Sequence, residues 1–279
     1  MLFGGTPIKS NGRFEIDFDL TRKSGFKYVD VQNLINRDSP VYNLSDDEFK
    51  KYFVELKAEL EKNELIPYQL HSLWEFLKND NDKEENWGTL LPYFKKAIIA
   101  ANILGVKYVV LHHRFPYMYE ESNLTKKYGE DLNIRFLKEL LPCAIENNVI
   151  LCLENLPFGA SYCHVDGTLN IINKINSKNL EMCLDTGHLN SIEENRDIYK
   201  HILKIGKHLK CLHVHDNPGD IDRHLLPGEG NINWNNFAKG LLKIGFDGCV
   251  SLECCSSKKN SKAMCEENNK TIDFLKALF

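Results

Sequence analysis

The chain has 279 residues, of which 43% are hydrophobic and 27% are charged, and its formal net charge is -4 at pH 7. This composition is typical of an ordinary globular protein, and without a strongly basic block it gives no support for nucleic-acid binding. No apolar stretch reaches the roughly 18 residues of a transmembrane helix, so we expect no membrane span.

The first residues, MLFGGTPIKSNGRF, lack the pattern of a signal peptide. The nine cysteines lie mostly inside apolar runs. This placement indicates reduced, buried thiols rather than a disulfide framework. We therefore expect a cytoplasmic protein.

The apolar pattern predicts strands that alternate with amphipathic helices along the whole chain. The expected strands are residues 1–5, 27–33, 65–71, 107–112, 149–154, 180–185, 210–215 and 249–253. The expected helices are residues 14–24, 46–63, 89–104, 128–147, 167–176, 192–208, 233–244 and 260–278.

Near-continuous apolar strands alternating with helices are typical of a parallel sheet that helices cover. Eight such units in 279 residues match the size of one (β/α)8 barrel. We therefore predict an α/β fold, a (β/α)8 TIM barrel that forms a single domain over residues 1–279. A doubly wound open sheet is the alternative, but no GxGxxG motif follows the first strand.

Six of the expected strands end on a side chain that can bind metal or transfer a proton. These side chains are His71, His112, Glu154, Asp185, His213 with His215, and Glu253. In a parallel barrel the carboxyl ends of all strands open on one face, and that face holds the active site. We therefore expect these residues to converge on one pocket.

The stretch KCLHVHDNPGDIDRHLLPGEG, residues 210–230, is the richest in such groups. His213 and His215 occupy alternate strand positions and so share a face. Asp222 and His224 follow in the loop, and histidine with aspartate suits a first-row divalent metal. A carboxylate that ends a run as apolar as VILCLE, as Glu154 does, is seldom buried without a metal or arginine partner.

One divalent cation could be held by Glu154, Asp185, Glu253 and one of the two strand-seven histidines. Such a set suits Zn, Mn, Mg or Co about equally. Further candidate ligands are His71, His112, His188, Asp222 and His224. Together they exceed what one ion needs, so they could form a two- or three-metal cluster that activates water against a phosphoester. Alternatively, the extra imidazoles bind sugar hydroxyls around a single metal.

For some other residues, a purely structural role is as plausible as a role in binding. Trp74 and Phe115 could stack on a sugar ring or base, or simply pack in the core. Arg223 could bind a phosphate or lie solvated at the rim. We expect the three histidines in loop or helix patterns to lie on the surface; these are His164, His201 and His208.

The strand-end motifs carry a resemblance to a known superfamily. They are VVLHH (109–113), LCLENLP (151–157), MCLDTGH (182–188), LHVHDN (212–217), DRHLLPGEGNINW (222–234) and VSLE (250–253). With them, the chain from about residue 65 onward resembles the xylose isomerase-like barrel superfamily. This group contains sugar (phosphate) isomerases and epimerases together with AP endonuclease family 2, to which endonuclease IV belongs.

The resemblance to the isomerases implies one metal at Glu154, Asp185, Glu253 and a strand-seven histidine. The two glutamates would also move a proton between adjacent carbons through an enediolate. His188 matches a substrate-binding histidine, and we expect His224, Arg223 and Trp74 to contact substrate as well.

The resemblance to endonuclease IV instead implies up to three zinc ions. The matching positions are His71, His112, Glu154, Asp185, His188, His213, Asp222, His224 and Glu253. Which strand-seven histidine binds metal stays open, because the spacing His-x-x-Asp favours His213 and the pattern HxH favours His215.

We therefore expect a cytoplasmic, metal-dependent isomerase or epimerase that acts on a small sugar or sugar phosphate, with neither nucleic acid nor membrane as partner. A multi-zinc phosphoesterase resembling endonuclease IV is the alternative, and a non-catalytic sugar-binding barrel is a third. The sequence leaves open whether the chain forms a homo-oligomer.

Overall fold

The computed structural model describes residues 1–9, 15–74, 87–114, 123–159, 161–192, 196–254 and 261–279. The strands are β1 (Leu2–Gly5), β2 (Tyr28–Val31), β3 (Ile66–His71), β4 (Tyr108–Leu111), β5 (Ile150–Glu154), β6 (Leu180–Asp185), β7 (Leu209–His213) and β8 (Cys249–Leu252). The helices are α1 (Phe18–Lys23), α2 (Asp46–Lys62), α3 (Trp87–Leu104), α4 (Asn123–Glu146), α5 (Val165–Ile175), α6 (Thr186–Ile192), α7 (Ile198–Ile205), α8 (Trp234–Ile244) and α9 (Ser261–Lys276).

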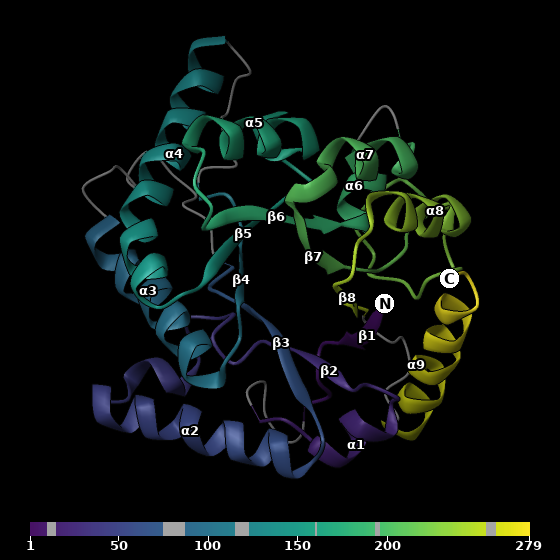
Figure 1. The fold of residues 1–279 in the computed structure, drawn as a ribbon, viewed down its shortest axis with the longest axis horizontal. Coiled ribbons are helices and arrows are strands. Elements are labelled where there is room, and N and C mark those ends of the chain that lie inside the picture. Colours follow the sequence, from purple (N-terminus) through teal and green to yellow (C-terminus); the bar gives the residue numbers. More distant parts are fainter. Residues whose placement is uncertain (10–14, 75–86, 115–122, 160, 193–195, 255–260) are drawn as a thin grey trace.

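The eight strands form one parallel sheet in the order β7-β6-β5-β4-β3-β2-β1-β8. A parallel bridge from Val214 to Leu252 links the two ends of this order, and Val214 N donates to the carbonyl of Ser251 at 2.8 Å. The strands thus surround a central axis and the helices lie outside them (Figure 1). The predicted TIM barrel is confirmed.

Helix α2 illustrates how the sequence sets these elements. Ser45 and Glu48 form a capping box at its start, which satisfies otherwise unpaired backbone N–H groups. Its buried residues, Phe49, Phe53, Leu56 and Leu60, recur every three or four positions and so make one apolar stripe against the sheet.

Two differences from the expected elements bear on the site. The predicted helix 192–208 is wrong at its start, because α6 begins at Thr186 directly after β6 and α7 follows as a second helix. Strand β7 ends at His213 rather than residue 215, so His215 stands beyond the regular ladder. Both differences lie at the face where the strands end.

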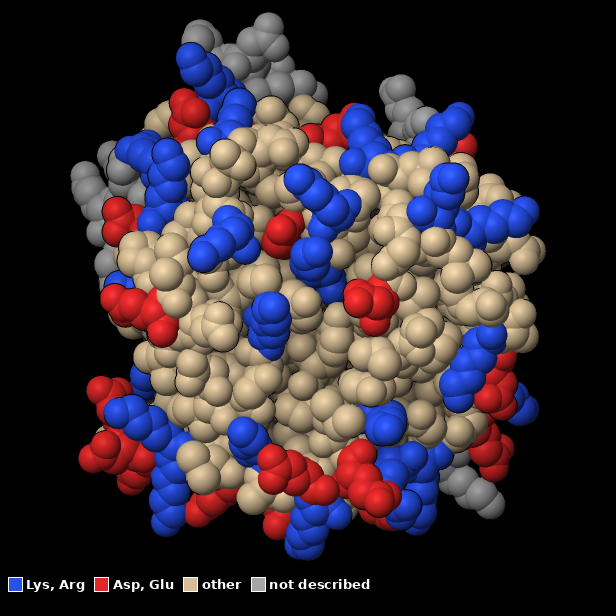
Figure 2. Space-filling view, viewed as in Figure 1, with Lys and Arg blue, Asp and Glu red and all other residues tan. Residues whose placement is uncertain are grey.

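Several predictions about exposure can be compared with the structure. The eight cysteines that it describes are all free, as expected of reduced thiols. No described helix has the length and apolar character needed to cross a membrane. The prediction that His201 lies on the surface is wrong, since it is only 8% exposed on the inward side of α7. On the face shown in Figure 2, basic and acidic side chains are interspersed.

Candidate active site

The strand-end side chains come together at the carboxyl ends of the strands. Five of them end or directly follow strands β3 to β7: His71, His112, Glu154, Asp185 and His213. Glu253 directly follows β8. The other members stand on α6 and on the segment after β7: His188, His215, Asp222 and His224.

A central group consists of Glu154, Asp185, His213 and Glu253, whose candidate ligand atoms all lie within 4.8 Å of one another. His213 Nδ1 is 3.0 Å from Glu154 Oε1 and 3.2 Å from Glu253 Oε2. His215 does not belong to this group. The geometry therefore distinguishes the two strand-seven histidines, with His213 facing the paired glutamates.

A second group shares Glu154 with the first. His112 Nε2 lies 3.2 Å and His71 Nε2 3.6 Å from Glu154 Oε2, whereas Oε1 of the same carboxylate faces His213. The carboxylate is fully buried. Glu154 thus lies between two sets of imidazoles and presents one oxygen to each.

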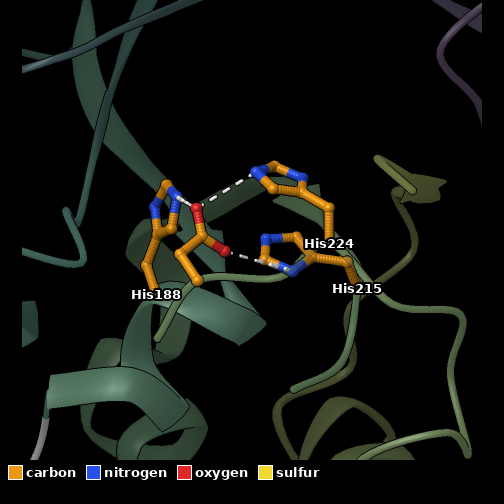
Figure 3. Close-up of side chains that lie close together, drawn as sticks. His188, His215 and His224 are labelled. Carbon is orange, nitrogen blue, oxygen red and sulfur yellow. Dashed lines mark ion pairs between the residues drawn. The ribbon is translucent and has the colours of Figure 1, made fainter. Parts of the chain in front are cut away.

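A third group surrounds Asp222 (Figure 3). His224 Nε2 and His188 Nε2 lie 3.1 Å and 3.4 Å from Asp222 Oδ2, and His215 Nδ1 lies 3.7 Å from Oδ1. The rings of His215 and His224 stack with centroids 4.0 Å apart. His215 Nε2 also lies 2.9 Å from Asp185 Oδ2, so this histidine connects the third group to the central one.

The loop that carries Asp222 and His224 is fastened by Asp216. Leu225 folds back and pairs with Asp216 through two backbone hydrogen bonds of 2.8 and 2.9 Å. The carboxylate Oδ2 of Asp216 accepts hydrogen bonds from the Gly228 backbone and from Trp234 Nε1, both at 2.9 Å. The segment GEGNINW therefore serves to hold the loop in place.

Three histidines have their ring orientation set by backbone carbonyls. The pairs of Nδ1 and carbonyl oxygen are His71 with Ser72 (2.7 Å), His188 with Asn155 (2.8 Å) and His224 with Glu253 (2.7 Å). A carbonyl oxygen only accepts, so each Nδ1 carries a proton and Nε2 faces the carboxylates. This arrangement is typical of histidines that bind metal.

Two carboxylate oxygens in the site are buried and make no hydrogen bond with any described residue. They are Glu154 Oε2 and Asp222 Oδ1. A buried polar atom without a hydrogen bond is costly, and a cation beside each oxygen would remove that cost. Imidazole nitrogens and carboxylate oxygens suit Zn, Mn, Mg or Co. The residues present therefore fit divalent cations.

The charges of the site also favour cations. Burial opposes ionisation of Glu154, but the imidazoles of His213 and His112 outweigh it and lower its pKa well below the usual value. Burial likewise opposes protonation of His188 and His224. Nearby carboxylates, Asp222 among them, outweigh this and raise the pKa to about 9 for His188 and about 10 for His224. Without a metal the carboxylates thus hold protons on these imidazoles.

A cavity of about 540 Å³ opens over the three groups. One wall is largely apolar and consists of Ile35, Trp74, Leu156, Pro157 and Phe158. The polar lining consists of His71, His112, Glu154, His188, Asp222, His224 and Glu253, with Lys9 and Asn36. Both glutamates of the central group thus reach the cavity, whereas Asp185, His213 and His215 are not among its lining residues.

The structure places Arg223, one of the expected substrate contacts, outside the cavity lining. The Arg223 side chain is exposed and forms an ion pair with Asp220, three residues earlier, and it does not line the cavity. A guanidinium at the loop surface finds its partner on the same turn, so its position does not support a role in orienting substrate. Trp74 does line the cavity, whereas Phe115 falls outside the described residues.

Three residues near the site were not predicted. Asp30 on β2 lies 3.0 Å from His213 Nε2. Asn155 holds the Asp185 backbone with hydrogen bonds of 3.0 and 2.9 Å, and Lys9 lines the cavity. The signal for Asp30 was present, because an acidic residue in the middle of the strand YVDV needs a buried partner.

Gly187 on α6 makes room for His215. A Cβ at this position would lie 2.0 Å from His215 Cε1 and 2.2 Å from Nδ1, so the ring would have to move. We expect Gly187→Ala to lower the free energy of unfolding by about 1–3 kcal/mol, the usual cost of overpacking. Denaturant unfolding measures it.

A double-mutant cycle provides the control for this prediction. In a His215→Ala background the clash is absent, so adding Gly187→Ala should cost clearly less. Equal costs in the two backgrounds would show that the ring contact is not the cause.

The family model described as "Xylose isomerase-like TIM barrel" matches residues 18–278. The chain belongs to this family. Among relatives in the xylose isomerase-like family, an uncharacterized protein of Methanocaldococcus jannaschii is 30% identical over 206 residues, 73% of this chain and 68% of that protein. Inosose isomerase of Bacillus subtilis is 26% identical over 263 residues, 91% of this chain and 88% of the enzyme.

A solved structure has a similar fold. D-psicose 3-epimerase from Clostridium cellulolyticum, crystallised with D-tagatose, superposes with a TM-score of 0.79 and 19% identity, covering 100% of this chain and 99% of that one. At this identity the likeness supports the xylose isomerase-like fold, and the chemistry must be argued from the side chains.

Proposed function

We propose that the chain is a metal-dependent isomerase or epimerase of a small sugar or sugar phosphate, acting by proton transfer through an enediolate. The observation that carries this proposal is the pair Glu154 and Glu253. Both line the cavity, and both lie within 3.2 Å of His213 Nδ1 in the central group. Relatives named as a sugar epimerase and inosose isomerase support it.

The central group would hold one divalent ion through Glu154, Asp185, His213 and Glu253. When bound, the ion would polarise the substrate carbonyl and stabilise negative charge that develops on its oxygen. His213 rather than His215 is proposed as the ligand, because only His213 shares contacts with both glutamates.

The two glutamates are proposed as acid and base. One carboxylate would remove a proton from a substrate carbon, and the other would return a proton to that carbon or its neighbour. Gln32 Nε2 donates to Glu253 Oε1 at 3.0 Å, which fixes the side-chain orientation of this glutamate. Glu253 is partly exposed, so it can exchange protons with substrate more readily than the fully buried Glu154.

The remaining lining would select the substrate. His188 and His224 present imidazoles to the cavity and could bind hydroxyls, and Trp74 offers an apolar face for a sugar ring. The volume lies within the range of small-molecule sites. Lys9 is the one lysine or arginine among the described lining residues, and it would suit the phosphate of a sugar phosphate.

A metal count with a substrate panel tests the proposal. Elemental analysis of the purified, unchelated protein is expected to give close to one divalent ion per chain. Incubation with a panel of ketoses and their phosphates in deuterium oxide should then show exchange at the carbon that loses the proton. Absence of both exchange and product for the whole panel would contradict the proposal.

One observation favours a second candidate function, a multi-zinc phosphoesterase. The three groups lie side by side, and the central one shares Glu154 with the second and is bridged by His215 to the third. Three ions so placed would activate water against a phosphoester. Close to three zinc ions per chain, with cleavage of abasic-site DNA, would establish this alternative.

A cytoplasmic location remains part of the proposal, supported by the free, mostly buried cysteines. The proposed partners are small molecules rather than nucleic acid or membrane. A measurement of its mass in solution would determine whether the chain forms a homo-oligomer.

A further inference from the structure

His213 is held on both sides by buried carboxylates. Its Nδ1 faces Glu154 and Glu253 at 3.0 and 3.2 Å, and its Nε2 faces Asp30 Oδ2 at 3.0 Å. His213, Asp30 and Glu154 have at most 1% of their surface exposed. Asp30 belongs to none of the groups of candidate metal ligands among the described residues. It lies on the side of the His213 ring that faces away from the two glutamates.

The orientation of this ring is the reverse of the other fixed histidines. His71, His188 and His224 donate Nδ1–H to backbone carbonyls and present Nε2 to the site. In His213 it is Nδ1 that faces the site, so with a cation bound beside the two glutamates the ring proton would lie on Nε2, where Asp30 accepts it. A carboxylate is a stronger acceptor than a carbonyl and makes the opposite nitrogen a better donor to a metal.

Asp30 lies beside an irregularity in the sheet. The register between β2 and β3 shifts between Val29 and Asp30, where β3 carries one extra residue between the partners of these two positions. Gln69, the β3 partner of Asp30 in the register, donates its Nε2 to Asp30 Oδ2 at 3.3 Å. A buried carboxylate is costly unless it is paired, and here its main partner is His213.

We infer that Asp30 is a positioning residue that fixes the proton of His213 on Nε2 and so makes Nδ1 the nitrogen that binds the divalent ion. The inference rests on the proposed metal centre and assigns Asp30 no contact with substrate. Without this carboxylate, His213 could take the other tautomer, with the proton on Nδ1 and no lone pair directed at the site.

Zinc affinity is the first test. The full-length protein is stripped of metal and titrated with Zn²⁺ against a chromophoric chelator. Asp30→Asn is expected to weaken binding by about 10–100-fold, as for other residues that support a metal-binding histidine. Asp166→Asn is the matched control, because it makes the same chemical change on α5, where Asp166 pairs with Lys204 on the exposed surface. It should bind Zn²⁺ as the wild type does.

The tautomer of His213 is the second readout, and a merely structural role of Asp30 would not change it. In the zinc-loaded wild type, nitrogen-15 NMR of the imidazoles should show the His213 proton on Nε2 and zinc on Nδ1. A proton on Nδ1 would overturn the inference. This measurement tests the assigned tautomer even if Asp30→Asn fails to fold.

The outcomes separate this inference from the proposed function. If Asp30→Asn binds Zn²⁺ as tightly as the wild type while the wild type isomerises sugars, the inference fails and the function stands. If the wild type binds Zn²⁺ through Nδ1 and Asp30→Asn weakens it, but no sugar is turned over, the function fails and the inference stands.

Discussion

Glu253→Gln is expected to reduce sugar turnover by at least about a hundredfold, the lower range of what a positioned acid or base contributes. The amide keeps the shape of the side chain and its contact with Gln32, but it cannot take up a proton from carbon. It also replaces the charged side chain of a proposed metal ligand by a neutral one. The turnover number of the metal-loaded variant, compared with its metal content, separates these two effects.

Glu181→Gln is the matched control for this variant. Glu181 lies on β6 near its start and pairs with His208 at 2.7 Å, away from the cavity lining. The same chemical change there should leave turnover unchanged. Full activity of Glu253→Gln would rule out both the isomerase and the phosphoesterase interpretations, since each needs this carboxylate.

Metal removal is expected to abolish turnover and to lower the thermal unfolding midpoint by roughly 5–10 °C. Saturation at about a hundred times the dissociation constant stabilises a protein by about 2.7 kcal/mol, and each kcal/mol shifts the midpoint of a chain near this size by roughly 2–4 °C. The effect is measured by scanning calorimetry before and after chelation, and readdition of the ion should restore both properties. A midpoint that does not respond to chelation would contradict a metal centre here.

The pH dependence of metal binding follows from the same groups. Burial opposes protonation of His213, but Glu253 and Glu154 outweigh it and raise its pKa well above the usual value. A histidine must lose its proton from the liganding nitrogen before it binds metal, so binding releases protons. The stabilisation by metal should therefore grow as the pH rises.

The sequence was most informative where the position of a residue along a strand determines which way its side chain points. The barrel places every strand's carboxyl end on one face, so apolar runs ending in His71, Glu154 or Glu253 were enough to predict a shared pocket. The choice between His213 and His215 was not predictable, because alternate positions share a face only while the strand continues. The strand ends at His213, and His215 therefore turns toward Asp222.

Other features depend on contacts that no local pattern encodes. Asp30 and His213 are 183 positions apart, and no local sequence pattern pairs them. The short helix α6 was missed because its seven residues, TGHLNSI, carry too few apolar positions to show a helical period. The sequence also did not predict that Arg223 pairs with Asp220 on the loop surface.

The order of the strands along the chain has a consequence for how the protein matures. The central group draws its members from β5, β6 and β7 and from Glu253 directly after β8, and β8 is also the strand that pairs with β1 and closes the barrel. During synthesis, a chain that has not yet produced β8 has neither a closed barrel nor its second glutamate. At the proposed metal centre, binding at full affinity would therefore require the completed fold, and truncated chains would not compete with the finished protein for scarce ions.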